Sequence, residues 1–366
     1  MSRLTGQNQR RATIKDIASL ANVSIGTVDR VLHNRGEVNP DTRNRVMSFI
    51  EELGYTPNLI AKSLALKKSF KIAALIPGAG ESNPYWTKPL EGINKAAAEL
   101  KDYNAEIVVS NFDAGEEGSF IRQFERILSG NPSGVILAPQ FYEASLHYTN
   151  LCKEKGIPVV FIDTDLEGAP GLSYFGQDAL QSGYVAARLM HYGLPECSKV
   201  LILNLARNKL ITRHMQLREQ GFMNYFKEVV PDHCIRALPV EIDLSQAQEP
   251  GASMHEILSH ETDISGIFVT NSRVHKVARY LSGMPGRHRL LVGYDLIEAN
   301  LEFMENGIID FLICQKPEEQ GYKSAMAMYD YLLTGTAIGK VNHSPIDIVV
   351  KENSGYYRNI INLSNT

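Results

Sequence analysis

Two short motifs have residue types that could serve enzyme chemistry, but neither motif is complete. Gly78 and Gly80 follow an apolar run, as glycines that cradle a dinucleotide phosphate would, yet Asn83 occupies the third glycine position. His255 and His260 are five residues apart. Two zinc ligands on one helix face need a spacing of four, because five residues turn the second side chain about 140° away. The chain also has no serine elbow or phosphate loop, so it predicts no catalytic residue, no metal site and no cofactor.

Residues 13 to 32 indicate a different chemistry, which is contact with DNA. Thr13 can cap a first helix and Ser24 a second one. The expected inward faces are Ile14, Ile17, Ala18 and Leu20 in the first helix, and Val28, Val31 and Leu32 in the second. The connection between them is too short for the helices to lie side by side, so they must cross steeply. This is typical of a helix-turn-helix, whose second helix enters the major groove.

A third helix is predicted to begin at Pro40, after Asn39, and to end before Gly54. Its apolar stripe is expected to comprise Val46, Phe49, Ile50 and Leu53. Several short motifs also occur at fixed positions between Ile14 and Ala65. They include Ile17-Ala18, Thr27-Val28, Arg30-Val31-Leu32, Leu53-Gly54-Tyr55 and Pro57-Asn58. This stretch resembles the head and hinge of the LacI/GalR family of transcription regulators.

The resemblance implies a set of DNA-binding residues in the head and hinge. They are Thr13, Ser24, Ile25, Thr27, Val28, Arg30, His33, Asn34, Tyr55, Asn58, Ala61 and Leu64. Ile25 and Gly26 stand where the family usually has larger polar side chains. We therefore expect Ile25 to meet a thymine methyl and Thr27 and Arg30 to make the other base contacts. The family's operator sequences do not transfer to this chain.

Charge and composition agree with a basic head on an acidic body. Residues 1 to 70 carry 11 Lys and Arg against 6 Asp and Glu, whereas the remainder carries 26 against 35. A net positive head suits contact with phosphates. The four cysteines have no CxxC spacing, so free thiols in a reducing compartment are expected. No apolar stretch is long enough to span a membrane or to form a signal peptide, so we expect a cytoplasmic protein without membrane contact.

From residue 71 onward, short apolar runs alternate with helix-length segments, which predicts parallel α/β sheets with covered faces. The expected strands are residues 72–76, 106–110, 134–138, 159–163, 200–205, 266–269, 290–294, 311–314 and 346–350. Helices are expected between most of them, for example over 89–101, 118–128, 144–155, 181–191 and 213–228. This layout resembles the two-lobed periplasmic sugar-binding-protein fold, which supplies the effector domain of the LacI/GalR family.

The fold class is therefore α/β, with an all-α helix-turn-helix head joined by a hinge helix to a two-lobed domain of parallel doubly wound sheets. The head is expected over residues 1–56, the hinge helix and linker over 57–70, and the effector-binding domain over 71–366. Within that domain the N-lobe is expected at about 71–173 and 315–343, and the C-lobe at about 174–314 and 344–366. Ligand is expected in the cleft between the lobes, at the carboxyl ends of the strands.

The resemblance also implies which residues bind the effector. They are Tyr85, Trp86, Asp163, Arg218, Asn271, Asp295 and Gln315. The polar members would hold hydroxyl groups, while an aromatic ring covers an apolar sugar face. Ser272 and Gln140 depart from the pattern of sugar-binding relatives, which leaves the identity of the sugar open.

We therefore expect a homodimeric DNA-binding transcription regulator, most simply a repressor, controlled by a carbohydrate-like effector. Its two heads would read a pseudo-palindromic double-stranded operator. One alternative is the same architecture sensing a nucleobase, a sugar acid or a protein corepressor, because fold does not fix ligand. Arg218 with Arg207 or Lys209 could accept a carboxylate. A sugar-processing enzyme with a DNA-binding head is the second alternative, and it would show turnover of a sugar.

Overall fold

The computed structural model describes residues 14–32, 36, 38–53, 68–80, 83–208, 210–232, 234–245 and 249–363. The head contains three helices, which are α1 (Ile14–Leu20), α2 (Ile25–Leu32) and α3 (Pro40–Glu52). Seven of the expected DNA-binding residues lie outside the described residues, as does most of the expected hinge. These residues are Thr13, His33, Asn34, Tyr55, Asn58, Ala61 and Leu64.

The head packs around a small apolar core made of Ile17, Ala18, Ala21, Val28, Val31 and Val46. Two expected core residues are corrected, because Leu20 is 51% exposed and Leu53 is 37% exposed. Helical geometry explains the first case: Ile14, Ile17, Ala18 and Ala21 follow the i, i+3, i+4, i+7 stripe, whereas Leu20 lies beside it. Leu53 follows the last residue of α3, where the helical face no longer directs the side chain inward.

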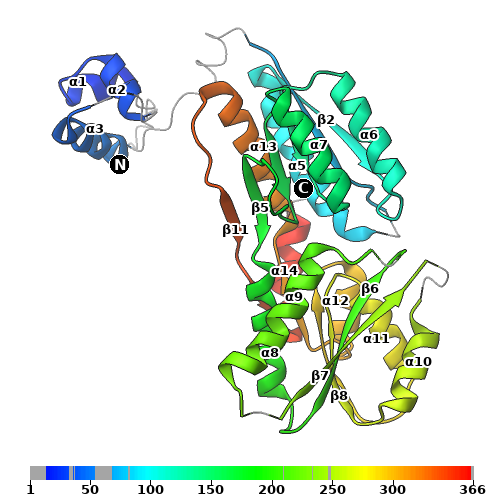
Figure 1. The fold of residues 1–366 in the computed structure, drawn as a ribbon. Helices are drawn as coiled ribbons and strands as arrows, with labels where there is room; N and C mark the ends of the chain where they lie inside the picture. Colours follow the sequence, from blue (N-terminus) through cyan, green and yellow to red (C-terminus); the bar gives the residue numbers. More distant parts are fainter. Residues whose placement is uncertain are drawn as a thin grey trace, which may run out of the picture.

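The remainder of the chain forms two six-stranded sheets, one in each lobe, whose strands follow equivalent orders (Figure 1). The N-lobe sheet has the order β11-β5-β4-β3-β1-β2, and the C-lobe sheet has the order β12-β10-β9-β8-β6-β7. All pairings are parallel except that of β10 with β12. The N-lobe strands are β1 (Phe70–Pro77), β2 (Ala105–Phe112), β3 (Gly134–Leu137), β4 (Val159–Ile162), β5 (Ser173–Gln177) and β11 (Val341–Ser344). The C-lobe strands are β6 (Lys199–Ala206), β7 (Arg236–Asp243), β8 (Ile264–Val269), β9 (Leu290–Tyr294), β10 (Phe311–Cys314) and β12 (Asp347–Val349).

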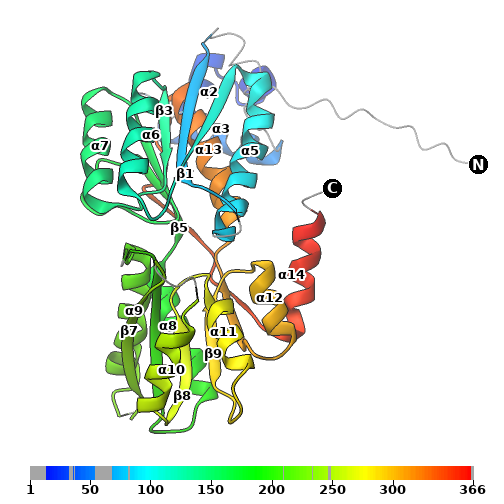
Figure 2. The same cartoon turned by 90° about the vertical axis from the view of Figure 1, so that its right-hand side faces the viewer.

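Helices cover both faces of each sheet (Figures 1 and 2). Those of the N-lobe are α5 (Thr87–Leu100), α6 (Glu117–Ser129), α7 (Tyr142–Glu154) and α13 (Pro317–Thr334). Those of the C-lobe are α8 (Ala179–Gly193), α9 (Arg213–Asn224), α10 (Gly251–His260), α11 (Val274–Ser282), α12 (Glu298–Glu305) and α14 (Lys351–Leu363). A π-helical turn, Tyr225–Val229, extends α9. None of the described helices is long and apolar enough to cross a membrane.

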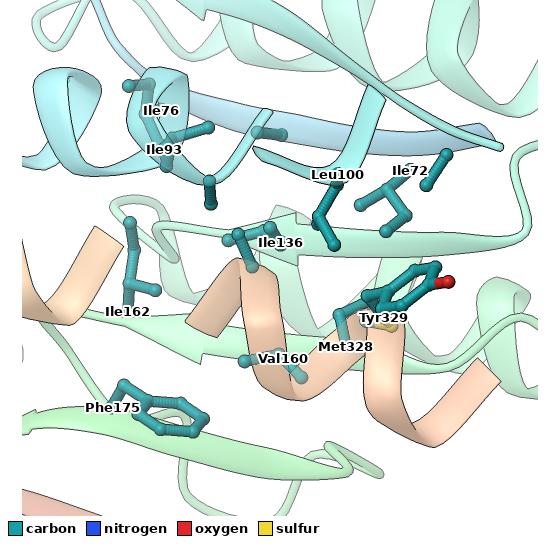
Figure 3. Packing of buried hydrophobic residues seen from close by; sticks show 14 of the residues in the cluster. Ile72, Ile76, Ile93, Leu100, Ile136, Val160, Ile162, Phe175, Met328 and Tyr329 are labelled. Carbon is teal, nitrogen blue, oxygen red and sulfur yellow. The ribbon is translucent and has the colours of Figure 1, made fainter. Parts of the chain in front are cut away.

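Each sheet is buried by apolar side chains from its strands and helices. On one face of the N-lobe sheet, Ile72, Ile136 and Val160 pack against Ile93 and Leu100 of α5 and Met328 and Tyr329 of α13 (Figure 3). Such burial contributes roughly 1.5–3 kcal/mol for each large side chain. The strands are thus fixed in place, and their carboxyl ends form a firm base for a site.

Paired glycines let helices touch closely in both lobes. A Cβ at Gly92 of α5 would lie 2.0 Å from the Glu318 carbonyl oxygen of α13. In the C-lobe, a Cβ at Gly221 of α9 would lie 2.0 Å from the Leu180 carbonyl oxygen of α8. Glycine is therefore required at these crossings, and the second crossing fixes the helix that carries Arg218.

The chain passes between the lobes after β5, after β10 and after β11, as the fold resemblance implied. The first crossing lies slightly later than the expected boundary near residue 173, because β5 pairs with β4 through Gln177. The Gln177 side chain joins all three crossings: its Nε2 donates to the carbonyl oxygens of Cys314, at 3.0 Å, and Pro345, at 3.2 Å.

The expectation of four free thiols is wrong for two of the cysteines. Cys197 and Cys234 form a disulfide with a Cα–Cα distance of 4.4 Å, while Cys152 and Cys314 are free and buried. The register of the C-lobe sheet explains the pairing. Lys199 of β6 lies opposite Arg236 of β7, so the residues two places before each strand also lie opposite each other.

Candidate ligand cleft and DNA-contacting head

One cleft between the lobes contains all seven residues that the resemblance assigned to the effector. Its lining includes Tyr85, Trp86, Asp163, Arg218, Asn271, Asp295 and Gln315. Asp163, Asp295 and Gln315 directly follow the ends of β4, β9 and β10, and Asn271 lies two residues beyond β8. Because parallel strands end at the same edge, residues distant in sequence meet here.

A hydrogen-bonded chain of three side chains forms the C-lobe wall of the cleft. Arg218 Nη2 donates to Gln315 Oε1 at 3.3 Å, and Gln315 Nε2 donates to Asp295 Oδ1 at 2.9 Å. Arg218 Nη1 also donates to the Thr270 carbonyl oxygen at 2.8 Å, and its guanidinium lies 3.6 Å from the centre of the Tyr294 ring. Arg218 Nε is buried without a partner among the described atoms. These hydrogen bonds hold the wall in place, and its polar groups can still bind a ligand in the cleft.

Asp295 has an unusual acidity for a carboxyl group. Burial raises its pKa to about 7, and the Arg218 charge and the Gln315 hydrogen bond only partly oppose this. A ligand hydroxyl would therefore meet a carboxyl that changes charge near neutral pH. It can act as donor or acceptor according to its protonation.

Tyr85 and Asp163 build the N-lobe wall. The Tyr85 hydroxyl donates to Asp163 Oδ1 at 2.6 Å, and burial, followed by the Asp163 charge, raises the pKa of Tyr85 well above its usual value. The Trp86 ring lies edge to face against Tyr85, with ring centres 5.4 Å apart. Both aromatic side chains line the cleft while also packing in the N-lobe core. They can present an apolar surface to a ring without being mobile.

His214 connects the two walls. It lies on α9 of the C-lobe, and its Nδ1 is 2.9 Å from the Thr164 hydroxyl and 3.7 Å from Asp163 Oδ2. Burial lowers the pKa of His214 to about 4, so the ring is neutral at pH 7. Two further contacts join the lobes: Asn208 Nδ2 donates to the Gly115 carbonyl oxygen at 2.7 Å, and Arg213 pairs with Glu167 at 3.0 Å. The structure is thus a closed form of the cleft.

Asn271 uses its side chain within the protein. Its Nδ2 donates to the Leu205 carbonyl oxygen at 2.7 Å, and its Oδ1 accepts from the Arg273 backbone N–H at 3.1 Å. Asn271 therefore holds the loop after β8 in place at the cleft.

Several residues that line the cleft were missed by the sequence reasoning, and the two with ionisable side chains are His214 and Arg273. His214 lies four residues before Arg218, one helical turn away on the same face, so the spacing could have found it. Arg273 follows Asn271 by two residues in the same loop after a strand. In the parts of the chain that the structure describes, no group of side chains is arranged to hold a metal ion.

The head presents part of the expected DNA-contacting set. The Thr27 backbone N–H donates to Ser24 Oγ at 3.1 Å, which confirms Ser24 as the cap of α2. Ile25 and Arg30 are exposed and Thr27 is half-buried, so α2 has side chains available for a groove. Val28 is corrected, because it is fully buried in the head core and cannot reach a base edge.

Comparisons with known proteins match both parts of the chain. A family model described as bacterial regulatory proteins, lacI family, matches residues 13–58, and one described as a periplasmic binding protein domain matches residues 73–337. The ribose operon repressor of Halalkalibacterium halodurans is 30% identical over 77% of this chain and 80% of its own length. That of Bacillus subtilis is 27% identical over 78% and 81%. The crystal structure of a LacI transcriptional regulator, described as putative, from Bacteroides fragilis is 30% identical, with a TM-score of 0.72. The match covers 79% of this chain and 100% of that one.

Proposed function

The chain belongs to the lacI family of bacterial regulatory proteins, and we propose that it represses transcription until a small carbohydrate-like effector binds or leaves its cleft. The observation that carries this proposal is the convergence of Arg218, Asp295 and Gln315 with Tyr85 and Asp163 in one cleft. A helix-turn-helix head accompanies that cleft in the same chain. The relatives are transcription regulators, and we propose no catalytic step.

The DNA partner would be a double-stranded operator with two half-sites. A two-fold homodimer presents two identical α2 helices, and such a dimer reads a pseudo-palindrome. Ile25, Thr27 and Arg30 are the side chains that we assign to base edges, since they are among the accessible side chains of α2. Residues 1–56 would act as the head, residues 57–70 as the hinge and residues 71–366 as the effector domain, in a cytoplasmic protein.

Ligand control would act through closure of the cleft. The contacts between Asn208 and Gly115 and between Arg213 and Glu167 form only when the lobes approach. A ligand that contacts both walls favours the closed form, because it binds that form more tightly than an open one. Rotation of one lobe against the other, about crossings tied by Gln177, would then change the spacing of the two hinges and so the affinity for DNA.

Selection of DNA tests the proposal directly. Full-length protein is incubated with a pool of random duplexes, the bound duplexes are sequenced, and the affinity for the selected site is measured by fluorescence anisotropy with and without sugars. We expect an inverted repeat and an affinity that changes with a sugar that also raises the melting temperature. Recovery of no preferred sequence, or an operator affinity that no bound ligand alters, would contradict the proposal.

A further inference from the structure

We propose that the effector carries a negative charge, as a sugar acid or a sugar phosphate does, and that Arg207 and Arg273 bind this charge. The inference rests on the proposed function only in taking the cleft as the effector site. It adds the chemical class of the ligand and a subsite made from two side chains. Neither arginine is among the residues through which a neutral sugar was expected to bind.

The two arginines lie together on the C-lobe wall. Arg207 directly follows β6 and Arg273 follows β8, and these two strands are neighbours in the sheet. Arg273 Nη1 donates to the Leu205 carbonyl oxygen of β6 at 3.2 Å, so its guanidinium is turned toward the end of β6 where Arg207 stands. Both side chains line the cleft.

No carboxylate neutralises this pair within the described parts of the chain, because neither Arg207 nor Arg273 forms an ion pair there. Their proximity is itself unfavourable: burial, followed by the charge of Arg207, lowers the pKa of Arg273. Arg207 is exposed and Arg273 is half-buried, so the two like charges repel each other, and a bound anion would relieve that repulsion. A ligand bound in the cleft can supply that anion.

The neighbouring carboxylates have other partners. Asp243, at the end of β7, accepts from the backbone N–H groups of Asn208 at 3.0 Å and Ser245 at 2.9 Å. Asp113, across the cleft, accepts from the Gly115 N–H at 2.8 Å. Inside the cleft, Asp163 is bonded to Tyr85 and Asp295 to Gln315. These carboxylates organise their own loops.

Two helix ends add to the positive potential at the same wall. Helix α11 begins at Val274, directly after Arg273, and α9 begins at Arg213, directly after Thr212, which also lines the cleft. The N-terminus of a helix favours an anion through its free N–H groups and its dipole. The arginines and the helix ends therefore act in the same direction.

The arrangement also gives the ligand an orientation. The hydroxyl-binding chain of Arg218, Gln315 and Asp295 involves the ends of β9 and β10, whereas the arginine pair lies at the ends of β6 and β8. Strand β8 lies between β6 and β9 in the sheet. An anionic sugar would thus place its carboxylate or phosphate toward β6 and its hydroxyl groups toward β10.

Inorganic phosphate probes the subsite without knowledge of the effector. The melting temperature of full-length protein is measured at increasing phosphate concentration, with chloride keeping the ionic strength constant. Three proteins are compared: wild type, the double variant Arg207→Gln with Arg273→Gln, and the control Arg236→Gln. Arg236 is an exposed arginine at the opposite end of β7. We expect saturable stabilisation in wild type and control and its loss in the double variant. Equal stabilisation of all three proteins would overturn the proposal, because it would indicate phosphate bound elsewhere, for example on the basic head. The absence of stabilisation in all three would overturn it as well.

A matched panel then separates the sources of the charge. Calorimetry compares neutral hexoses and pentoses with their uronates or aldonates and their phosphates. We expect one anionic series to bind at least tenfold more tightly than its neutral counterparts, and the double variant to lose that preference. Tight binding of a neutral sugar that the double variant retains would refute the charged ligand and leave the effector site intact. The proposed function fails separately, if ligands bind but leave operator affinity unchanged.

Discussion

Asp163 and Asp295 occupy the same position in the two lobes. Each directly follows a strand whose neighbour in the sheet leads into the other lobe, and the two residues have φ angles of 66° and 70°. The Asp163 backbone N–H donates to the Phe175 carbonyl oxygen at 3.0 Å, and the Asp295 backbone N–H donates to the Ile313 carbonyl oxygen at 3.0 Å. A left-handed conformation is uncommon for residues other than glycine, although aspartate adopts it more readily than most residues do. The repeated geometry indicates that both lobes use the same turn to bring a carboxylate to the cleft.

Asp295 and His214 predict opposite dependences of stability on pH. The folded pKa of Asp295 is raised to about 7, so the native state binds more protons than the unfolded state between about pH 4 and 7, and stability falls as pH rises through that range. The folded pKa of His214 is lowered to about 4, so the unfolded state binds more protons below about pH 6.5, and stability rises with pH from about 4 to 6.5.

Urea unfolding of Asp295→Asn and His214→Gln at several pH values between 4 and 8 separates these effects. Relative to Asp295→Asn, wild type should lose stability from pH 4 to 7, and relative to His214→Gln it should gain stability from pH 4 to 6.5. Parallel pH profiles for wild type and either variant would contradict the corresponding assignment.

The close crossing of α8 and α9 predicts a sharp difference between two glycines in helices. Gly221→Ala places a Cβ 2.0 Å from the Leu180 carbonyl oxygen, so the helices must separate, which should cost about 1–3 kcal/mol and shift Arg218. Gly355→Ala in α14 meets no atom within 4 Å and should stabilise by roughly 0.5–1 kcal/mol. Chemical denaturation measures both. Equal stability changes would show that the helices are not in close contact.

The sequence predicted the strands with continuous apolar runs and missed three others. Strand β7 was missed because Pro239 and exposed residues interrupt its pattern, as an edge strand allows. The sequence of β11, Val-Asn-His-Ser, has one apolar residue, and β5 buries Tyr174, Phe175 and Gln177 without an aliphatic run. Pairing with neighbouring strands, rather than local pattern, determines these three.

The site was predictable only where residues directly follow recognised strands or match the family. Asp163, Asp295 and Gln315 are of this kind. The Arg207 and Arg273 pair depends on which strands are neighbours, and the Cys197–Cys234 disulfide depends on the register of β6 and β7. Both depend on how distant segments pair in the sheet, and the spacing of residues along the sequence does not show this pairing.

The basic head predicts salt-dependent binding to DNA. If Arg30, Arg43 and Arg45 neutralise phosphates, log affinity should fall linearly with log salt, with a slope of about −0.9 for each phosphate contacted. Arg45→Ala should reduce the slope by about one contact, while Arg126→Ala on the exposed surface of α6 should not. An affinity that is flat in salt would mean that the head does not bind the DNA backbone.

Leu64, which lies outside the described residues, predicts a specific role for the hinge. By family resemblance, Leu64 enters the minor groove at the operator centre and kinks the duplex. Leu64→Ala should weaken operator binding at least tenfold, about 1.4 kcal/mol, and leave effector affinity unchanged. Gel-shift titration and calorimetry measure the two quantities. Unaltered operator affinity would remove the assignment.

Arg218 and Asp295 predict regulators that bind DNA but do not respond to effector. They come from α9 and from the turn after β9, and Gln315 hydrogen-bonds to both. Removal of either leaves its polar partners in the closed cleft unsatisfied, a loss of roughly 1–3 kcal/mol, so effector affinity should fall at least tenfold in Arg218→Ala and in Asp295→Ala. Operator affinity without ligand should persist, because neither residue lies in the head. Calorimetry that gives wild-type effector affinity in both variants would place the effector outside this cleft.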